Sequence, residues 1–366
     1  MAHTLKVPDT PSSTMSSSAS TLLPPGHPPV APHAHLDGKC PLSDHNSHEY
    51  CPPQKGDLRS VCPALNTMAN HGYIHRNGKD LTFGVLFRGL KECYGLTTAL
   101  TVVLVTGGFL GIHRSPLRIP YISDLPFFHA TNPDGTKSPG GVIDLHLIGR
   151  HNGVEHDASL VHLNTPEGEE YAPVEIQDGW VPKLVGDIIP PVVGYSAAEG
   201  LESDSTAHTR TNTENSDGSS DTGPTYYASS YTLPALRKYI SDPAYLSTLV
   251  DEADVGRMRA RRQREISPIK LDPVHAEIAR GEMAIILGVW RKEAEAEDGK
   301  KGGKGGIPLP WLLQWLAEER LPDVPVGLEK GSTATKMWRP ERKQTLSNVV
   351  KRSKMIRKVT EEIESG

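Results

Sequence analysis

The segment SVCPALNTMANHGYIHRNG, residues 60–78, carries the clearest folding signal in the chain. Its apolar residues recur at i, i+3 and i+4 from Leu65, which places them on one face of a helix. Pro63 suits the first helical position, so Cys62 is expected at or beside the N-cap. The free amides of the first turn then point toward the Cys62 sulfur and favour thiolate over thiol. A cysteine that only caps the helix is the alternative interpretation.

A thiolate held at a helix start is a good axial ligand for haem iron. The string CPALNTMANHGYI resembles the proximal motif of the fungal haem-thiolate peroxidases, the family of chloroperoxidase and the unspecific peroxygenases. The resemblance runs through Cys62, Pro63, Ala64, Leu65, Asn66, Ala69, Asn70, His71, Gly72, Tyr73 and Ile74. Val61 departs from it, because the family usually has proline before the cysteine. The resemblance implies a single, mainly α-helical domain in which Cys62 ligates haem b and Pro63, Ala64 and Leu65 line the cofactor site.

A second motif, VEHDASL at residues 154–160, resembles the family's Glu-His-Asp sequence followed by serine. We expect a short helix here, on which Glu155 and Ser159, four residues apart, share one face. The resemblance implies a Mg²⁺ or Mn²⁺ ion held by the Glu155 carboxylate, the His156 backbone carbonyl, the Ser159 hydroxyl and a haem propionate. Oxygen donors of this kind suit hard cations. A solvated acidic turn is the alternative.

The same motif supplies two candidate catalytic residues. The His156 side chain would point about 100° away from the metal-binding face and could reach the distal side of the haem. Asp157 can accept a hydrogen bond from the imidazole and fix its tautomer. The alternative is a surface histidine–aspartate pair without a catalytic role.

Peroxide cleavage needs a base that moves a proton between the two oxygens, and the resemblance implies a downstream carboxylate. Glu265, Glu277 and Glu282 compete for this role. Glu282 aligns with Ile285 and with further apolar residues at i+4 and i+7, so we expect it on the buried face of a helix. Burial should raise its pKa toward neutrality, which suits proton transfer. A salt-bridged glutamate at a helix end is the alternative.

Composition divides the chain into a folded domain and polar ends. We expect a disordered Ser/Pro/His-rich segment over 1–54, the peroxidase-like domain over 55–345 and a charged tail over 346–366. Apolar periodicity predicts helices within 81–112, 232–265, 275–291 and 307–319, the last with Trp311 and Trp315 as packing residues. Irregular insertions are expected at about 113–141 and 196–223.

Charge and hydropathy exclude several classes of partner. The net charge is −5, so general attraction to nucleic acid is absent, and the arginines between 257 and 264 should form a solvated helix face. Residues 93–112 are uncharged but contain four glycines and four threonines, which favours buried helices over a membrane span. The N-terminal residues lack a secretory signal pattern, and no Asn-x-Ser/Thr sequon occurs, so an intracellular location is expected.

The resemblance implies a reaction of hydrogen peroxide with a small organic substrate. Val154, Gly281 and Ile285 neighbour the candidate catalytic residues and are aliphatic or small. We therefore expect an apolar pocket that admits bulky substrates and favours oxygen transfer to carbon, in a role such as secondary metabolism. Halide oxidation through hypohalous acid and haem binding without turnover are the alternatives.

Overall fold

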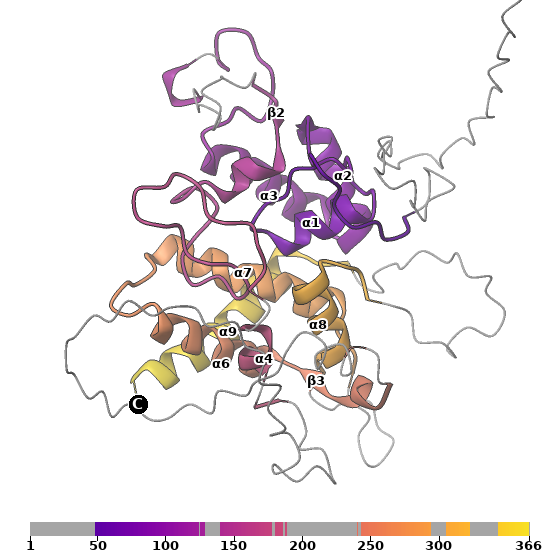
Figure 1. The fold of residues 1–366 in the computed structure, drawn as a ribbon, viewed down its shortest axis with the longest axis vertical. Helices are drawn as coiled ribbons and strands as arrows, with labels where there is room; N and C mark the ends of the chain where they lie inside the picture. The colour runs from indigo at the N-terminus through magenta and orange to yellow at the C-terminus, as the bar shows by residue number, and fades with distance from the viewer. Residues whose placement is uncertain are drawn as a thin grey trace, which may run out of the picture.

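The computed structural model describes residues 48–123, 125–128, 140–177, 180–185, 187–188, 240, 243–293, 305–322 and 343–365. Most of the predicted N-terminal segment and the whole predicted insertion at 196–223 lie outside these residues. The described part is mainly α-helical, as predicted, with two small two-stranded sheets (Figure 1). Irregular chain and one 3₁₀ turn, η1 (Pro126–Phe128), make up the described residues of 113–141.

The helices and strands follow one another in a simple order. The helices are α1 (Pro63–Asn70), α2 (Phe83–Tyr94), α3 (Thr98–Gly111), α4 (Trp180–Val185), α6 (Glu252–Glu265), α7 (Pro273–Val289), α8 (Leu309–Glu318) and α9 (Leu346–Ser365). The short strands β1 (Leu81–Thr82) and β2 (Val142–Ile143) pair antiparallel, as do β3 (Leu249–Val250) and β4 (Ile307–Pro308). There are two further 3₁₀ turns among the described residues. The turn η2 (Leu145–Gly149) precedes the loop with the Glu-His-Asp motif, and η3 (Pro243–Ser247) precedes β3.

The apolar stretch predicted as one or two helices forms α2 and α3. Thr82 caps α2 by accepting a hydrogen bond from the Val85 amide, and Gly95 ends the helix in the left-handed conformation at φ 63°. The break at Gly95 divides the uncharged run between two helices that pack on each other. In the described part of the chain, every helix is too short or too polar to cross a bilayer.

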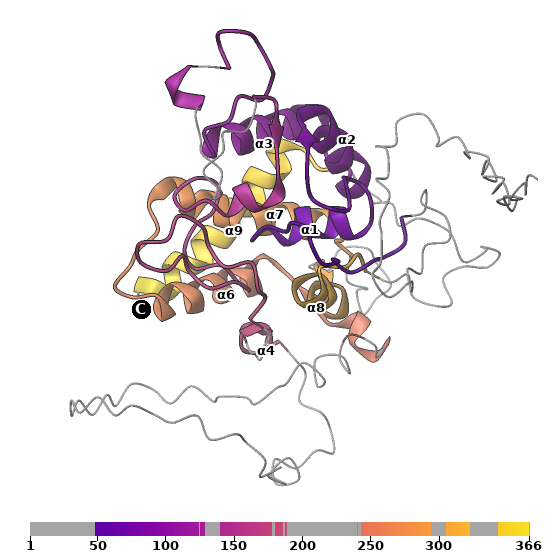
Figure 2. The same ribbon diagram turned by 45° about the horizontal axis from the view of Figure 1, so that its top comes forward.

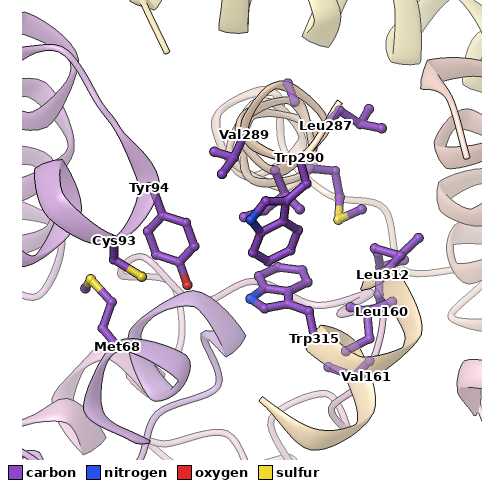
Figure 3. Close-up of a cluster of buried hydrophobic side chains, with 14 of the residues drawn as sticks. Met68, Cys93, Tyr94, Leu160, Val161, Leu287, Val289, Trp290, Leu312 and Trp315 are labelled. Atoms are coloured by element: carbon purple, nitrogen blue, oxygen red, sulfur yellow. The ribbon is translucent and has the colours of Figure 1, made fainter. Parts of the chain in front are cut away.

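Aromatic side chains from three helices meet in the core. Figure 3 shows Trp290, which follows the last turn of α7, packed against Trp315 of α8, with Tyr94 of α2 beside them. The two indole rings meet edge to face at 5.8 Å, a favourable arrangement for aromatic pairs. The Tyr94 hydroxyl donates a hydrogen bond of 2.8 Å to the Ala64 carbonyl and so ties α1 to this cluster. Trp315 is a packing residue, as predicted.

The arginine-rich helix differs from its prediction. A helix was predicted within residues 232–265, but the helix α6 begins only at Glu252. The turn η3 and the strand β3 precede it. Arg259 and Arg262 are buried, with exposed fractions of 7% and 3%, so a solvated face is the wrong description. Buried guanidinium groups need partners, and the hydrogen bonds of Arg259 are part of the site described below.

The C-terminal segment is also different from its prediction. Residues 346–365 form the helix α9, which packs along both α6 and α7 and is therefore not a free tail (Figures 1 and 2). A Cβ atom at Gly256 of α6 would lie 2.7 Å from the Val359 side chain, so glycine permits this close approach.

Candidate active site

One apolar cavity of about 930 Å³ joins the predicted site residues. Its walls come from α1, α2, α3, α7, α8 and α9 and from the loop that contains the Glu-His-Asp motif. Eleven of the twelve predicted residues line it: Cys62, Pro63, Ala64, Leu65, Val154, Glu155, His156, Ser159, Gly281, Glu282 and Ile285. The structure thus brings together residues that are more than 200 positions apart in the sequence.

Cys62 stands at the N-cap of α1, with Pro63 in the first helical position, as predicted. The Ala64 and Leu65 amides lie near the sulfur and lower the pKa of the thiol, although the Leu65 amide donates its hydrogen bond to the Cys62 carbonyl (3.1 Å). Burial and the nearby Glu282 carboxylate outweigh them and raise this pKa to about 12. The helix start alone therefore does not produce a thiolate, contrary to our expectation. A cation bound at the sulfur would reverse this balance, because a coordinating thiol is deprotonated.

The Asn66 side chain fixes the chain just before Cys62. Its Oδ1 accepts hydrogen bonds from the Ser60 amide (2.9 Å) and the Ser60 hydroxyl (3.1 Å). Its Nδ2 donates to the Ser60 carbonyl (2.7 Å) and to Glu319 Oε1 (2.6 Å). All four hydrogen-bonding positions are used, so Asn66 locks the loop against α1 and against the end of α8.

Glu319 was not anticipated from the sequence. It follows the last residue of α8 in a left-handed conformation (φ 49°) and is buried beside α1. Its backbone carbonyl accepts a hydrogen bond from Asn70, whose Oδ1 in turn accepts two from Arg59. Burial raises the pKa of Glu319 to about 7, although the Asn66 hydrogen bond and the Arg59 charge act in the other direction. A lone glutamate after a helix gives no local signal of this position.

The motif histidine His71 has a structural role. Its Nδ1 donates to the His48 carbonyl (2.8 Å), and its Nε2 accepts from the Leu321 amide (3.0 Å). Burial lowers the pKa of His71 to about 3, so the ring is neutral with both nitrogens satisfied. The ring thereby joins the end of α1 to the chain that follows α8.

The Glu-His-Asp segment is an extended loop, so the predicted short helix is wrong. Glu155 forms an isolated parallel bridge with His151, and Ala158 has a positive φ of 60°. A left-handed residue interrupts any helix, so Glu155 and Ser159 do not share a helical face. Polar contacts hold the loop instead: Glu155 Oε2 accepts from His151 Nδ1 (3.1 Å) and from the Thr165 hydroxyl (3.3 Å). Burial raises the pKa of Glu155.

The donors around Glu155 differ from the predicted set. The Ser159 hydroxyl accepts hydrogen bonds from the Val161 and His162 amides. The side-chain ligand atoms of His151, Glu155 and Asp157 all lie within 4.8 Å of one another. Among the described residues, the carboxylate of Glu155 is therefore grouped with His151 and Asp157, and not with the predicted partner Ser159.

The ring of His156 points at Glu282. Its Nε2 lies 3.6 Å from Glu282 Oε2, while its Nδ1 donates to the backbone carbonyl of Asp157 (2.7 Å). The carboxylate of Asp157 does not orient this ring, so that part of the prediction is wrong. Burial lowers the pKa of His156, but the hydrogen bond and charge of Glu282 outweigh it and raise the pKa overall.

Glu282 faces the cavity, where 44% of its side-chain surface is open. Besides His156, it meets Arg259 of α6, whose Nη2 lies 3.6 Å from Oε2. Burial raises the pKa of Glu282, but His156 and Arg259 outweigh it and lower the pKa below its ordinary value. The expected shift toward neutrality is therefore wrong, and the carboxylate is ionised at neutral pH.

Arg259 is the second residue that sequence analysis missed. It donates to the Ala158 and Ala279 carbonyls, and its buried Nε has no hydrogen-bond partner among the described residues. This guanidinium links the motif loop, α6 and α7 at the cavity wall. Its identity as a site residue depends on tertiary packing, because it lies among several arginines of similar sequence context.

The two competing glutamates are engaged elsewhere. Glu265 forms an ion pair with Arg262, and Glu277 accepts hydrogen bonds from Ser353 (2.6 Å) and Arg280 (2.9 Å). Glu277 also lines the cavity, so what distinguishes Glu282 among the three is its position beside both His156 and Arg259.

Comparison with known proteins agrees with this geometry. The family model described as "Peroxidase, family 2" matches residues 48–341, which include Cys62, the motif loop and Glu282. The chain belongs to this family. It is the haem-thiolate peroxidase family that the motifs resemble, and membership implies a haem cofactor.

Individual relatives align over shorter stretches. The chain is 33% identical to the aromatic peroxidase fscJ of Fusarium equiseti over 130 residues, or 33% of this chain and 28% of the relative. It is 25% identical to the chloroperoxidase of Leptoxyphium fumago over 125 residues, covering 34% and 29% of the two chains. An aromatic peroxygenase of Cyclocybe aegerita is 49% identical over 37 residues, 10% of each chain. The alignments thus span less than a third of the length of these relatives.

The residues around the cavity fit a haem. Cys62 offers a sulfur donor beside two amides that stabilise negative charge, and the walls are largely aliphatic. The volume of about 930 Å³ lies near the upper end of cavities that hold small organic ligands, roughly 300–1,000 Å³.

Glu319 should make stability depend on pH. Its folded pKa of about 7 lies above its ordinary value of 4.5, so the folded chain binds the proton more tightly. This stabilisation is complete below pH 4.5 and is lost as pH rises through 7, a change of about 3 kcal/mol. Glu319→Gln retains an acceptor for Asn66 without titrating. Between pH 4.5 and 8, the wild type should therefore lose about 3 kcal/mol of its free energy of unfolding through this group, whereas Glu319→Gln should not.

Denaturant titrations at several pH values measure this difference. Glu361→Gln, at an exposed position of α9, is the control and should follow the wild type. A constant difference between Glu319→Gln and wild type across this range would show that Glu319 does not titrate as described.

Proposed function

We propose that this protein is a haem-thiolate peroxidase or peroxygenase that uses hydrogen peroxide to oxidise or oxygenate an apolar organic molecule. One observation carries the proposal: the Cys62 thiol and the Glu282–His156–Arg259 group face the same apolar cavity. Family membership and the names of the relatives support it.

In this proposal, haem b is held by Cys62 through its iron and by the apolar walls formed by Pro63, Ala64 and Leu65. When bound, the haem supplies the redox chemistry that activates hydrogen peroxide. The chain's own contribution at this end is electrostatic, because the first-turn amides of α1 stabilise negative charge on the sulfur.

Glu282 would act as the acid–base catalyst. Its ionised Oε2 accepts a proton from one oxygen of hydrogen peroxide and returns it to the other oxygen, which leaves as water. His156 and Arg259 stabilise the carboxylate before the transfer and hold it in place. The Asp157 backbone carbonyl fixes the His156 ring through Nδ1.

The cavity lining favours apolar substrates. Val154 and Ile285 present aliphatic surface, and a Cβ atom at Gly281 would meet no atom within 4 Å, so there is open space beside Glu282. Relatives are named as an aromatic peroxidase, an aromatic peroxygenase and a dothistromin biosynthesis peroxidase. These names support an organic metabolite as the substrate, while another relative is named a chloroperoxidase, so the preference for oxygen transfer over halide oxidation rests on the apolar lining.

A divalent cation, Mg²⁺ or Mn²⁺, is the second cofactor in this proposal. Glu155 would be a ligand in either of two donor sets. The resemblance implies the first, with the His156 carbonyl, Ser159 and a haem propionate; the second consists of His151 and Asp157, whose ligand atoms lie within 4.8 Å of each other and of the Glu155 carboxylate. A set that contains the His151 imidazole would favour Mn²⁺ over Mg²⁺.

Substitution of Cys62 should change the ligation of the haem. Cys62→Ser is expected to lose the strongly red-shifted Soret band that reduced, carbon monoxide-bound thiolate haem shows, and most of the bound haem. Cys93→Ser, at a buried cysteine of α2, should keep both. The opposite result in the two variants would assign the iron ligand to Cys93.

Substitution of Glu282 should separate catalysis from haem binding. Glu282→Gln is expected to lower peroxide-driven turnover of an apolar substrate by about 10²–10⁴-fold, because the proton acceptor is removed, while the carbon monoxide spectrum stays the same. Glu265→Gln is the matched control and should remain active. If the wild type binds haem but shows no turnover, the protein is a non-catalytic haem protein instead. If the wild type halogenates a small acceptor efficiently and does not turn over bulky substrates, it is a haloperoxidase.

Metal analysis tests the cation. Glu155→Ala should contain about one equivalent less Mg²⁺ or Mn²⁺ than the wild type. Loss in Ser159→Ala would select the first donor set, and loss in His151→Ala the second. Equal metal in wild type and Glu155→Ala would refute the site.

A further inference from the structure

The helix α9 lies beyond residues 48–341, the part of the chain that the family model matches. It is nevertheless fixed to the centre of the fold. Gln344 Nε2 donates a hydrogen bond of 2.7 Å to the Gly288 carbonyl near the end of α7, and Ser353 donates one of 2.6 Å to Glu277 near its start. These two contacts set α9 antiparallel to α7, as Figure 2 shows for the two neighbouring helices.

The first turns of α9 reach into the cavity. Leu346, Val349 and Val350 stand at i, i+3 and i+4, share one helix face and line the cavity wall. Val349 is buried, whereas Leu346 and Val350 are 44% and 40% exposed. This face of α9 therefore continues from the cavity to the surface of the protein.

A matching stripe runs along α7. Val274, Ile278, Gly281 and Ile285 follow a helical spacing of four, three and four residues, and all line the cavity. At about 1.5 Å per residue, α7 rises roughly 12 Å between Val274 and Glu282. Val274 is 66% exposed, so the stripe begins at the surface and ends beside the acid–base group.

The helix α3 supplies the third wall. Val103, which lines the cavity, is 51% exposed, and Gly107 and Gly108 present bare backbone with no atom within 4 Å of a Cβ position. The mouth of the cavity thus has an apolar rim made by α3, α7 and α9. Glu277, the charged residue near it, is engaged by Arg280 and Ser353.

We propose that α9 forms one wall of an apolar access channel and that Leu346 and Val350 determine which substrates pass it. The channel suits an apolar substrate long enough to span about 12 Å from the rim to Glu282, with any polar end left at the rim. This inference rests on the proposed function, because it assigns the route by which the substrate of that reaction reaches the site.

The test measures binding of dodecanoate to the haem-loaded protein by perturbation of the Soret band. Leu346→Phe and Val350→Phe should narrow the channel and weaken dodecanoate binding at least 10-fold. Met355→Phe adds the same ring to the same helix at an exposed position away from the cavity and should bind as the wild type does. Cyanide, which is small enough to pass a narrowed channel, should bind all four proteins equally.

A substitution that removes side-chain volume should have the opposite effect on dodecanoate binding. Val350→Ala should widen the channel and bind dodecanoate at least as well as the wild type, while improving binding of a branched analogue. Wild-type affinity in Leu346→Phe and Val350→Phe, or the absence of dodecanoate binding to wild type, would overturn the channel. If the wild type itself shows no thiolate Soret band or no peroxide-driven turnover, the proposed function is refuted instead.

Discussion

The hydrogen bonds of Asn66 are the constraint on which the proximal side of the site depends. One amide side chain joins the residue before Val61 and Cys62 to the helix that follows them, and to Glu319 more than 250 residues later. Asn70 and His71 add parallel connections to Arg59, Glu319 and Leu321. The sulfur therefore has a fixed position because Asn66, Asn70 and His71 are hydrogen-bonded in the interior, where an unsatisfied group would be destabilising. The motif residues Asn66, Asn70 and His71 thus serve mainly to make these hydrogen bonds.

On the distal side, neighbouring charges determine the protonation state of the Glu282 carboxyl group. One carboxylate, Glu282, faces two cationic neighbours, His156 and Arg259, within a largely apolar cavity. Hydrophobic surroundings alone would favour the protonated acid, but the neighbouring charges favour the ionised form. The site thus combines an apolar space for an organic molecule with a carboxylate that remains able to accept a proton. On the proximal side the balance is reversed, because Cys62 has amide groups nearby but no cation beside it among the described residues.

Local sequence patterns predicted the elements that local physics determines. Pro63 and the apolar spacing after it predicted α1, and apolar periodicity predicted α2, α3, α7 and α8. The motif loop was misjudged because polar contacts of Glu155 and the left-handed Ala158 outweigh helical spacing. The helix α9 was missed because its buried face includes Ser353 and Thr360, so its sequence is polar even though the helix packs on the core. Arg259 and Glu319 could not be found at all, since their importance arises from partners on other elements.

The position of α9 also bears on the order in which the protein is assembled. During synthesis the chain emerges from its N-terminal end, and Cys62, the motif loop and Glu282 all precede α9. The wall formed by Leu346, Val349 and Val350 is therefore the last part of the cavity lining to be synthesised. A chain that stopped before α9 would carry every other wall but would leave the cavity open along this flank.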